Sequence, residues 1–356
     1  TVLIAIELAW VPGDGPLTVL TPAPTRLENT LYTPDHEFSV DIYTIGGIRE
    51  DVGIVLVNGI EPDGRRYAPL VELAQVLART GITVAVPELR SYSEYSLEPY
   101  DVSRLIRTYK FLLESTRVTP ERSGFLGFSA GGSLAFIAAT DPLIADSVGV
   151  VALIGPYSDL ERVLSATTTG TYQTETSLAR YLPRDLVWRV TRNTVLHGLL
   201  DLEERKFLRQ VFQGDHPVPD TRLLASNSRL SLSDEGKAIF NLFINRDAGL
   251  VPELVSRLPS RSRDLLVDLS PVNAIIRFQA RLLLMHEGGD PYFPAYESEE
   301  LNRLIPDQSS LIKTSFIEHA VLRTPALTPA NLFTFYLPES NKLLTYIHSL
   351  LIHTGT

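Results

Sequence analysis

The stretch that most constrains the fold is residues 121–140, which read ERSGFLGFSAGGSLAFIAAT. A short apolar run leads into Gly-Phe-Ser-Ala-Gly, and an unbroken series of small and apolar residues follows. This order predicts a buried strand, a sharp turn with Ser129 at its centre, and a buried helix. Glycines two positions before and after Ser129 let the strand and the helix meet closely, so that the serine hydroxyl can stand clear of the sheet.

The turn also puts Ser129 where a nucleophile can be activated. Backbone N–H groups and the positive end of the helix dipole would face the serine and stabilise negative charge on a reacting oxygen. A bare G-x-S-x-G string occurs by chance in about one of every eight to ten chains of this length. The alternative interpretation is a glycine-rich turn that only packs a helix on a sheet. The strand before it and the apolar helix after it favour the catalytic interpretation.

The rest of the chain alternates between strand and helix patterns, which is typical of a parallel sheet covered by helices on both faces. Strands are predicted at 36–44, 53–57, 82–86, 147–154, 281–285 and 311–317. Helices are predicted at 67–79, 102–113, 295–304 and 343–351. From 157 to 270 the alternation stops, and short helix patterns appear at 202–212, 233–244 and 251–258. We therefore predict an α/β fold with a mostly parallel, doubly wound sheet and an inserted helical region.

A serine hydroxyl needs a base within hydrogen-bond reach, and the base needs an acid that fixes its tautomer. After the inserted region, two strand ends carry one of each, Asp290 and then His319. The order of nucleophile, acid and base along the chain matches one fold in particular. Asp290 could instead be a turn residue and His319 a surface histidine. Asp159, which follows the strand at 147–154, is the alternative candidate for the acid.

The chain resembles the α/β-hydrolase family, of the lipase, esterase and dienelactone-hydrolase-like kind. The resemblance rests on GFSAGG around Ser129, on HEGGD followed by PYFP, and on the Glu-His pair at 318–319. It implies that Ser129 is the nucleophile, Asp290 the acid and His319 the base. It also implies an oxyanion hole made by the backbone of Ala130 and of the Gly59-Ile60 loop. Family members usually carry His-Gly where this chain has Asn58-Gly59.

The resemblance covers about residues 37 to 353 and divides the chain into three parts. Residues 1–35 are expected to be an N-terminal extension and linker. Residues 36–157 and 270–356 are expected to form the α/β-hydrolase core. Residues 158–269 are expected to form a helical cap, or lid, inserted into it.

The cap is rich in large apolar side chains, more than so thin a layer can bury within itself. We therefore expect some of them to cover the site and select apolar acyl groups. The predicted substrate-binding residues are Trp188 and Phe243 of the cap and Phe128, which precedes Ser129. The activity should then rise from acetate to at least butyrate esters, by about fourfold for each carbon, from roughly 0.8 kcal/mol per buried methylene. The alternative is that these residues form a small core of their own that never meets substrate.

The composition and net charge of the chain limit the kinds of partner and site that it could have. The 356 residues carry a net charge of −10 at a pI of about 5.3, which argues against nucleic acid and anionic membranes as partners. The sequence has no cysteine, which excludes disulfides, thiolate metal sites and a cysteine nucleophile. No cofactor motif or metal-ligand spacing stands out.

The N-terminal residues differ from the rest. Residues 1–11 are mostly apolar, too short to span a bilayer, and are interpreted either as the end of a removed signal or membrane anchor or as a packed strand or helix. The first interpretation would suit a secreted or membrane-anchored protein. Residues 12–34 hold five prolines, which favours an extended linker.

The sequence thus predicts a serine hydrolase that cleaves small-molecule carboxylic esters through an acyl-enzyme. A peptidase or amidase with the same three residues is the first alternative, because the motifs do not specify the leaving group. A non-catalytic binding protein that uses the fold is the second.

Overall fold

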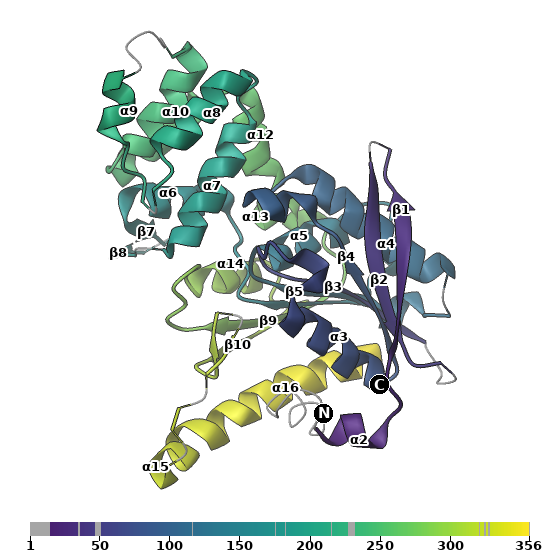
Figure 1. Ribbon diagram of the computed structural model, residues 1–356. Helices are drawn as coiled ribbons and strands as arrows, with labels where there is room; N and C mark the ends of the chain where they lie inside the picture. Colours follow the sequence, from purple (N-terminus) through teal and green to yellow (C-terminus); the bar gives the residue numbers. More distant parts are fainter. Residues whose placement is uncertain are drawn as a thin grey trace.

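The computed structural model describes the chain except for residues 1–14, 35, 47–50, 116, 175, 182, 215, 227–231, 320, 324, 327 and 356. An eight-stranded sheet forms its centre, in the order β1-β2-β4-β3-β5-β6-β9-β10 (Figure 1). Strands β1 and β2 pair antiparallel, β2 also pairs antiparallel with β4, and all further pairs are parallel. The strands are β1 (Thr25–Tyr32), β2 (Glu37–Thr44), β3 (Val52–Val57), β4 (Ile82–Pro87), β5 (Gly124–Phe128), β6 (Val150–Ile154), β9 (Arg281–Glu287) and β10 (Ser309–Thr314).

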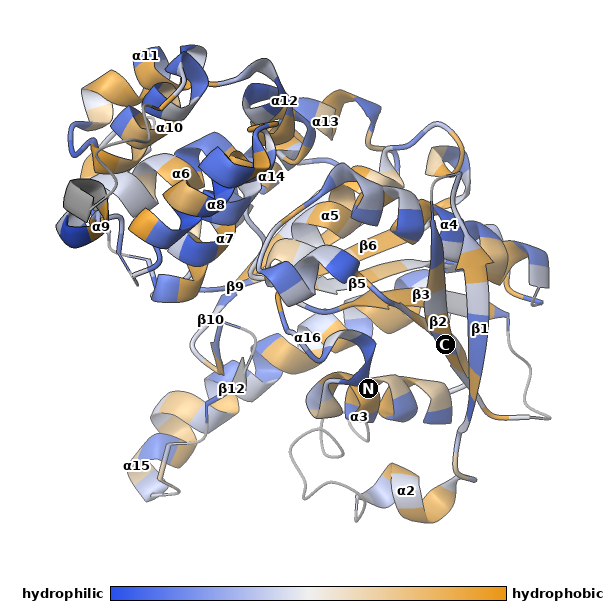
Figure 2. Cartoon of the chain, turned by 45° about the horizontal axis from the view of Figure 1, so that its top comes forward, coloured by the Kyte–Doolittle hydropathy of each residue, from blue (hydrophilic) through white to orange (hydrophobic). Residues whose placement is uncertain are grey.

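The central strands are the apolar runs of the sequence. Every residue of β3 and β4 is buried, as expected for parallel strands covered on both faces. Figure 2 shows this apolar character along β5 and β6, with polar residues concentrated on the outer helices. The parallel strands end at the same edge of the sheet, so the segments that follow β3, β5, β6 and β9 meet there.

Two helical layers cover the sheet. On one face, α3 (Ala68–Arg79) and α16 (Leu337–Thr354) share a hydrophobic cluster with the short α2 (Pro16–Leu20). On the other face, α4 (Pro99–Ser115), α5 (Ser129–Ala139) and α14 (Tyr296–Leu304) contribute to a second and larger cluster. The helices predicted at 67–79, 102–113, 295–304 and 343–351 correspond to α3, α4, α14 and α16.

A block of helices is inserted in the chain between β6 and β9. It lies over one end of the sheet (Figure 1). This helical insertion runs from α6 to α12. Its apolar residues belong to the same cluster as α5, so the insertion and the sheet layer share one core. Its elements are α6 (Leu160–Thr169), β7 (Thr171–Gln173), β8 (Leu178–Arg180), α7 (Asp185–His197), α8 (Leu202–Val211), α9 (Thr221–Ser226), α10 (Asp234–Ile244), α11 (Val251–Ser256) and α12 (Ser260–Asp268).

Short segments complete the chain. A two-stranded ribbon of β11 (Ile317–Glu318) and β12 (Val321–Leu322) follows β10. Among the described residues, no helix has the length and apolarity needed to cross a membrane. The remaining elements are α13 (Pro271–Ala274), α15 (Pro329–Asn331), the π-helical turn η7 (Leu332–Tyr336) and the 3₁₀ turns at Gly64–Arg66, Arg90–Glu94, Pro120–Arg122, Ala145–Ser147, Ala248–Leu250 and Ile275–Arg277.

The prediction of an extended linker over residues 12–34 was wrong for two segments. Residues 16–20 form α2, whose Leu17 is buried, and residues 25–32 form β1, which pairs with β2 along its whole length. Most of its side chains are exposed, so the strand carries little hydrophobic signal. Its position at the edge of the sheet explains this, and it also tolerates the prolines on either side. The interpretation of residues 1–11 as an anchor or signal falls outside the described residues.

Candidate active site

Ser129 is the first residue of α5 and directly follows β5. Its φ angle is +52°, in the left-handed region that non-glycine residues rarely occupy. The two motif glycines are required by close contacts. A Cβ at Gly127 would lie 2.5 Å from Gly132 Cα, and one at Gly131 would lie 1.9 Å from the carbonyl oxygen of Asn58. The strand–turn–helix structure predicted around Ser129 is therefore confirmed.

The loop after β3 lies against the serine. A Cβ at Gly59 would be 3.1 Å from Ser129 Cβ and 3.6 Å from its Oγ. Ile60 and Ala130 line the same cavity as Ser129. The N–H of Ala130 belongs to the first turn of α5, where backbone donors have no partner within the helix. The N–H of Ile60 donates to no described residue. Two backbone groups of the predicted oxyanion hole thus border the serine.

Asn58 takes the place of the usual histidine in this loop and is buried. Its backbone carbonyl accepts a hydrogen bond from the Tyr92 hydroxyl at 3.3 Å. Its side-chain amide nitrogen has no hydrogen-bond partner among the described residues. The close approach of Gly131 and the bond from Tyr92 hold the loop through its backbone, which does not depend on a histidine side chain.

Asp290, in the loop after β9, and His319, which directly follows β11, form a hydrogen-bonded pair. His319 Nδ1 lies 2.7 Å from Asp290 Oδ2. The other carboxylate oxygen accepts from the backbone N–H groups of Tyr292 at 2.7 Å and Phe293 at 3.1 Å. Burial alone would raise the pKa of Asp290, but the hydrogen bond and charge of His319 outweigh it and lower the pKa. Asp290 is thus held as the carboxylate that orients the imidazole.

The ring of Tyr292 packs on the imidazole of His319. The two rings stack with centroids 4.3 Å apart and an angle of 26° between their planes. Phe293 meets the same imidazole edge-on at 5.9 Å. Both aromatic residues also line the cavity that Ser129 lines. Ser129 and the two aromatic rings that contact His319 therefore border one cavity.

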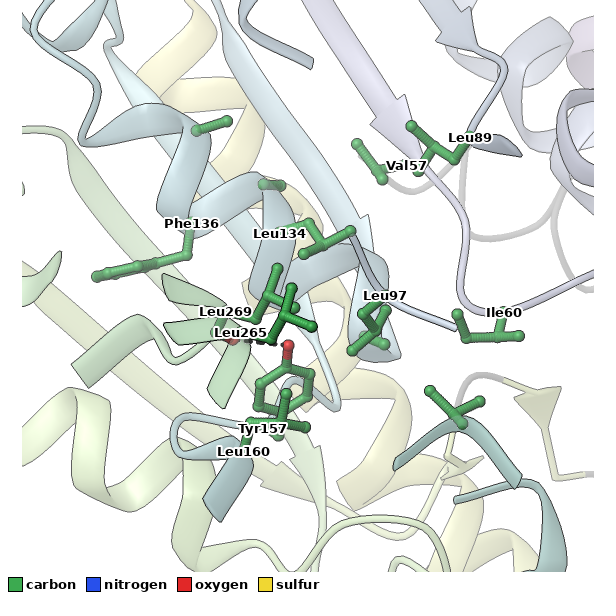
Figure 3. Close-up of a cluster of buried hydrophobic side chains, with 14 of the residues drawn as sticks. Val57, Ile60, Leu89, Leu97, Leu134, Phe136, Tyr157, Leu160, Leu265 and Leu269 are labelled. Atoms are coloured by element: carbon green, nitrogen blue, oxygen red, sulfur yellow. Dashed lines mark hydrogen bonds between the residues drawn. The ribbon is translucent and has the colours of Figure 1, made fainter. Parts of the chain in front are cut away.

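The cavity is small and apolar, with a volume of about 30 Å³. Its walls come from the sheet edge and from the helical insertion, and Figure 3 shows Ile60, Leu97, Tyr157 and Leu160 among the side chains packed there. The Tyr157 hydroxyl is turned away from solvent and donates to the carbonyl of Leu269 at 2.8 Å. The lining residues are Ile60, Leu97, Ser129, Ala130, Tyr157, Leu160, Val163, Leu186, Val187, Val190, Thr191, Tyr292 and Phe293.

The three predicted substrate-binding residues do not line this cavity. Trp188 and Phe243 pack on each other with ring centroids 5.0 Å apart, and Phe212 completes the cluster. Both are fully or almost fully buried inside the helical insertion. Phe128 packs against the cluster on the opposite face of the sheet. The structure thus places all three side chains away from the cavity next to Ser129. The sequence could not show this, because apolar residues of a helix look alike whether they face a cavity or a neighbouring helix.

Asp159, the alternative candidate for the acid, has a structural role, and so has His286. Asp159 caps the N-terminus of α6, where its carboxylate accepts from the N–H groups of Glu161 and Arg162. His286 is buried beside Asp290 and contacts Ser298 Oγ at 2.7 Å and the Phe293 carbonyl at 3.1 Å. Burial lowers the pKa of His286. It therefore stays neutral, and its contacts with Ser298 and Phe293 shape the turn after β9.

Two further charged or titratable side chains near this edge of the sheet have partners of their own. Arg65 is buried and forms ion pairs with Asp41 and Glu28. His197 lies half-buried between the insertion and the sheet layer, where it contacts Glu98. Burial lowers the pKa of His197 to about 4. Neither side chain reaches the cavity around Ser129.

Among the described residues, no group of three or more His, Cys, Asp or Glu side chains is placed to hold a metal ion.

Two residues that the sequence did not single out support His319. The histidine has a φ of +57°, and its N–H donates to the Glu287 carboxylate at 3.0 Å. Gly155, at φ +61°, comes so close to the acid–base pair that a Cβ there would lie 3.2 Å from His319 Nδ1. Glu287 follows His286 in the HEGGD motif, and Gly155 directly follows β6. Their sequence positions were visible, but their contact with His319 exists only in the folded chain.

We expect Glu287→Gln to lower kcat by about tenfold with little change in KM, because the neutral amide binds the strained His319 backbone less firmly and the imidazole loses alignment. Steady-state kinetics on the wild type and the variant measure this. Glu318→Gln is the matched control, since Glu318 is half-exposed and pairs with Arg184 at 3.5 Å. Equal effects of the two substitutions would contradict a positioning role for Glu287.

Comparison with known proteins finds no matching family model and no matching curated protein. Several solved structures are similar in fold. DcsB, solved in complex with its substrate analogue, has 11% identity and a TM-score of 0.53, over 93% of this chain and 100% of that one. A dipeptidyl aminopeptidase IV-like protein from Bacteroides ovatus has 12% identity and a TM-score of 0.51, over 88% of this chain.

This chain spans 34% of the length of the Bacteroides ovatus protein. The Pyrococcus furiosus esterase Pf2001 has 14% identity and a TM-score of 0.49, over 96% of this chain and 93% of that one. At such low identity, these likenesses concern the fold. The chain has the α/β-hydrolase fold, with a mostly parallel eight-stranded sheet, and the fold predicted from the sequence is confirmed.

Proposed function

We propose that this chain is a serine hydrolase in which Ser129 is the nucleophile, His319 the base and Asp290 the acid. One observation carries the proposal. Ser129, in a left-handed turn, lines the same cavity as Tyr292 and Phe293, and the rings of these two residues contact an imidazole that is hydrogen-bonded to a buried carboxylate. A turn that only packs a helix on a sheet would not need this pair at the same edge.

The proposed chemistry follows from the roles of the three side chains. Ser129 Oγ attacks the substrate carbonyl while His319 Nε2 accepts its proton. Asp290 keeps the proton of His319 on Nδ1 and stabilises the imidazolium that forms. His319 then donates the proton to the leaving group, and the acyl group remains on Ser129 as an ester. Water, activated by the same imidazole, hydrolyses this acyl-enzyme and regenerates the serine.

The oxyanion of the tetrahedral intermediate would be held by the backbone N–H groups of Ala130 and Ile60. Both groups border Ser129, and both are donors without a partner in their own segments. Donors aligned before the reaction stabilise the developing charge without reorganisation, and each contributes about 100- to 1,000-fold to kcat in comparable sites.

We propose carboxylic esters with a small apolar acyl group as the substrate class. The support is the cavity next to Ser129, whose walls are mostly hydrocarbon side chains. Such walls exclude charged acyl groups because a charge would be desolvated without a partner. An amide substrate is the remaining outcome of the test.

Two assays test the proposal. A fluorophosphonate should label the wild type at Ser129, identified by peptide mass mapping, and should leave Ser129→Ala unlabelled. Matched panels of p-nitrophenyl esters and N-acyl p-nitroanilides then compare ester with amide turnover. Labelling at another serine would overturn the assignment of the nucleophile, and turnover of anilides alone would make the protein an amidase.

A further inference from the structure

One helix of the insertion forms a wall of the cavity next to Ser129. Leu186, Val187, Val190 and Thr191 of α7 all line the cavity. Their spacing of one, three and one residues puts them on one face of the helix. We call these four residues the α7 wall. The opposite side of the cavity is formed by residues that follow sheet strands, among them Ile60 after β3 and Tyr292 after β9.

The space between the two sides is small. A cavity measured in this way needs about 10–15 Å³ to hold one water-sized group, so a volume of about 30 Å³ offers room for about two. For comparison, an engineered cavity of about 150 Å³ in another protein accommodates benzene. Val187 and Val190 are nearly fully buried, so their methyl groups fill what would otherwise be a deeper pocket.

Helix α7, which carries the α7 wall, is attached to the sheet layer on either side of these four residues. The N–H of Arg184 donates to the Pro291 carbonyl at 2.9 Å, next to the catalytic acid. Further along, Thr194 Oγ1 accepts from the N–H of Leu97 at 2.9 Å, and Asn193 Nδ2 donates to the Glu94 carbonyl at 2.8 Å. The bonds of Thr194 and Asn193 are buried or partly buried, and pulling α7 away would break them together with the bond of Arg184.

Aromatic packing supports α7 from behind. Trp188, which lies next to Val187 in the chain, is wedged against Phe212 and Phe243 of the insertion. The backbone of α7 therefore has supporting contacts on the side away from the cavity as well as bonds to the sheet layer. Closely packed interiors of this kind resist added volume, because an extra methylene forces side chains out of their preferred rotamers.

We infer that the α7 wall, through Val187 and Val190, sets the acyl-chain length of the enzyme, and that it restricts substrates to acetyl and propionyl groups. The inference rests on the proposed function, since it concerns the acyl group carried by Ser129. It replaces the sequence-based expectation that activity rises to butyrate and that Trp188 and Phe243 act as the selectors. In this arrangement the aromatic pair supports the wall but does not touch the substrate.

The test is a series of kcat/KM values for p-nitrophenyl acetate, propionate, butyrate and hexanoate, with the matching N-acyl p-nitroanilides run in parallel. For the wild type we expect a maximum at acetate or propionate and a fall of about tenfold to butyrate, as overpacking requires. Val190→Ala and Val187→Ala each remove two methyl groups from the wall. Each should move the maximum towards butyrate.

Val195→Ala is the matched control. Val195 lies on the same helix and is fully buried, but it does not line the cavity. This variant loses the same atoms from the same helix and should keep the wild-type chain-length profile. Circular dichroism and Tm values establish that the three variants are folded.

The outcomes separate the inference from the proposed function. A wild-type profile that rises to butyrate or hexanoate would overturn the inference, as would folded Val187 and Val190 variants with unshifted profiles. In both cases fluorophosphonate labelling of Ser129 would leave the hydrolase assignment intact. A wild type that is not labelled and that cleaves neither esters nor anilides would overturn the proposed function itself.

Discussion

Ser129→Ala is expected to reduce kcat for ester hydrolysis by a factor on the order of 10⁶, close to the loss caused by removing all three catalytic residues. The reason is that the three side chains act as a unit. Without Oγ, the His319 imidazole has no hydroxyl to deprotonate, and the acyl-enzyme does not form. Residual activity would come from substrate binding and the oxyanion donors of Ala130 and Ile60.

This loss should occur without unfolding. Ser129 lies at φ +52°, and the strain of that position is borne by the backbone for serine and alanine alike. The Tm should therefore change little, while fluorophosphonate labelling disappears. The measurement combines steady-state kinetics, mass mapping of the labelled peptide and thermal unfolding. Retained turnover in a variant free of wild-type contamination would show that another group attacks the substrate.

Asp290→Asn is expected to lower kcat by about 10⁴-fold with the fold preserved. The asparagine carbonyl can still accept from the N–H groups of Tyr292 and Phe293, which bind Oδ1 in the wild type. Its amide group then points an N–H at His319 Nδ1. That contact favours the tautomer with the proton on Nε2, which cannot act as the base towards Ser129.

Asp159→Asn is the control for this prediction. Asp159 follows β6 and was the alternative candidate for the acid, but its carboxylate caps α6. Asparagine is an equally good capping residue, so both stability and activity should stay near wild-type values. Kinetics of the two variants side by side decide the question. Loss of activity in the Asp159 variant together with a normal Asp290 variant would move the acid to the end of β6.

Much of the fold could be predicted from local sequence patterns, because its central strands are buried on both faces. Such strands appear as short apolar runs, and the runs at 53–57 and 82–86 correspond to β3 and β4. The turn at Ser129 is equally local, since its glycines lie within a few residues of the contacts they relieve. Strand β1 escaped prediction because an exposed edge strand needs no apolar pattern.

The candidate catalytic residues were predictable for a similar reason. Asp290 and His319 each follow a predicted strand, and the carboxyl ends of parallel strands meet at one edge of the sheet. The sequence thus determined which side chains could come together, and the structure adds the hydrogen bond of 2.7 Å between them. The supporting roles of Glu287 and Gly155 were not predictable, since both depend on contacts across the loops around His319.

The residues that line the cavity next to Ser129 were decided by tertiary structure alone. Helical periodicity shows that Val187 and Trp188 belong to an apolar face, but it does not show what each side chain meets. In the folded chain the smaller residue lines the cavity and the larger one packs behind it. Burial has the same sequence signature in both positions, because hydrophobic attraction is not directional. Which apolar residues line the cavity next to Ser129 is settled only when the insertion packs against the sheet layer.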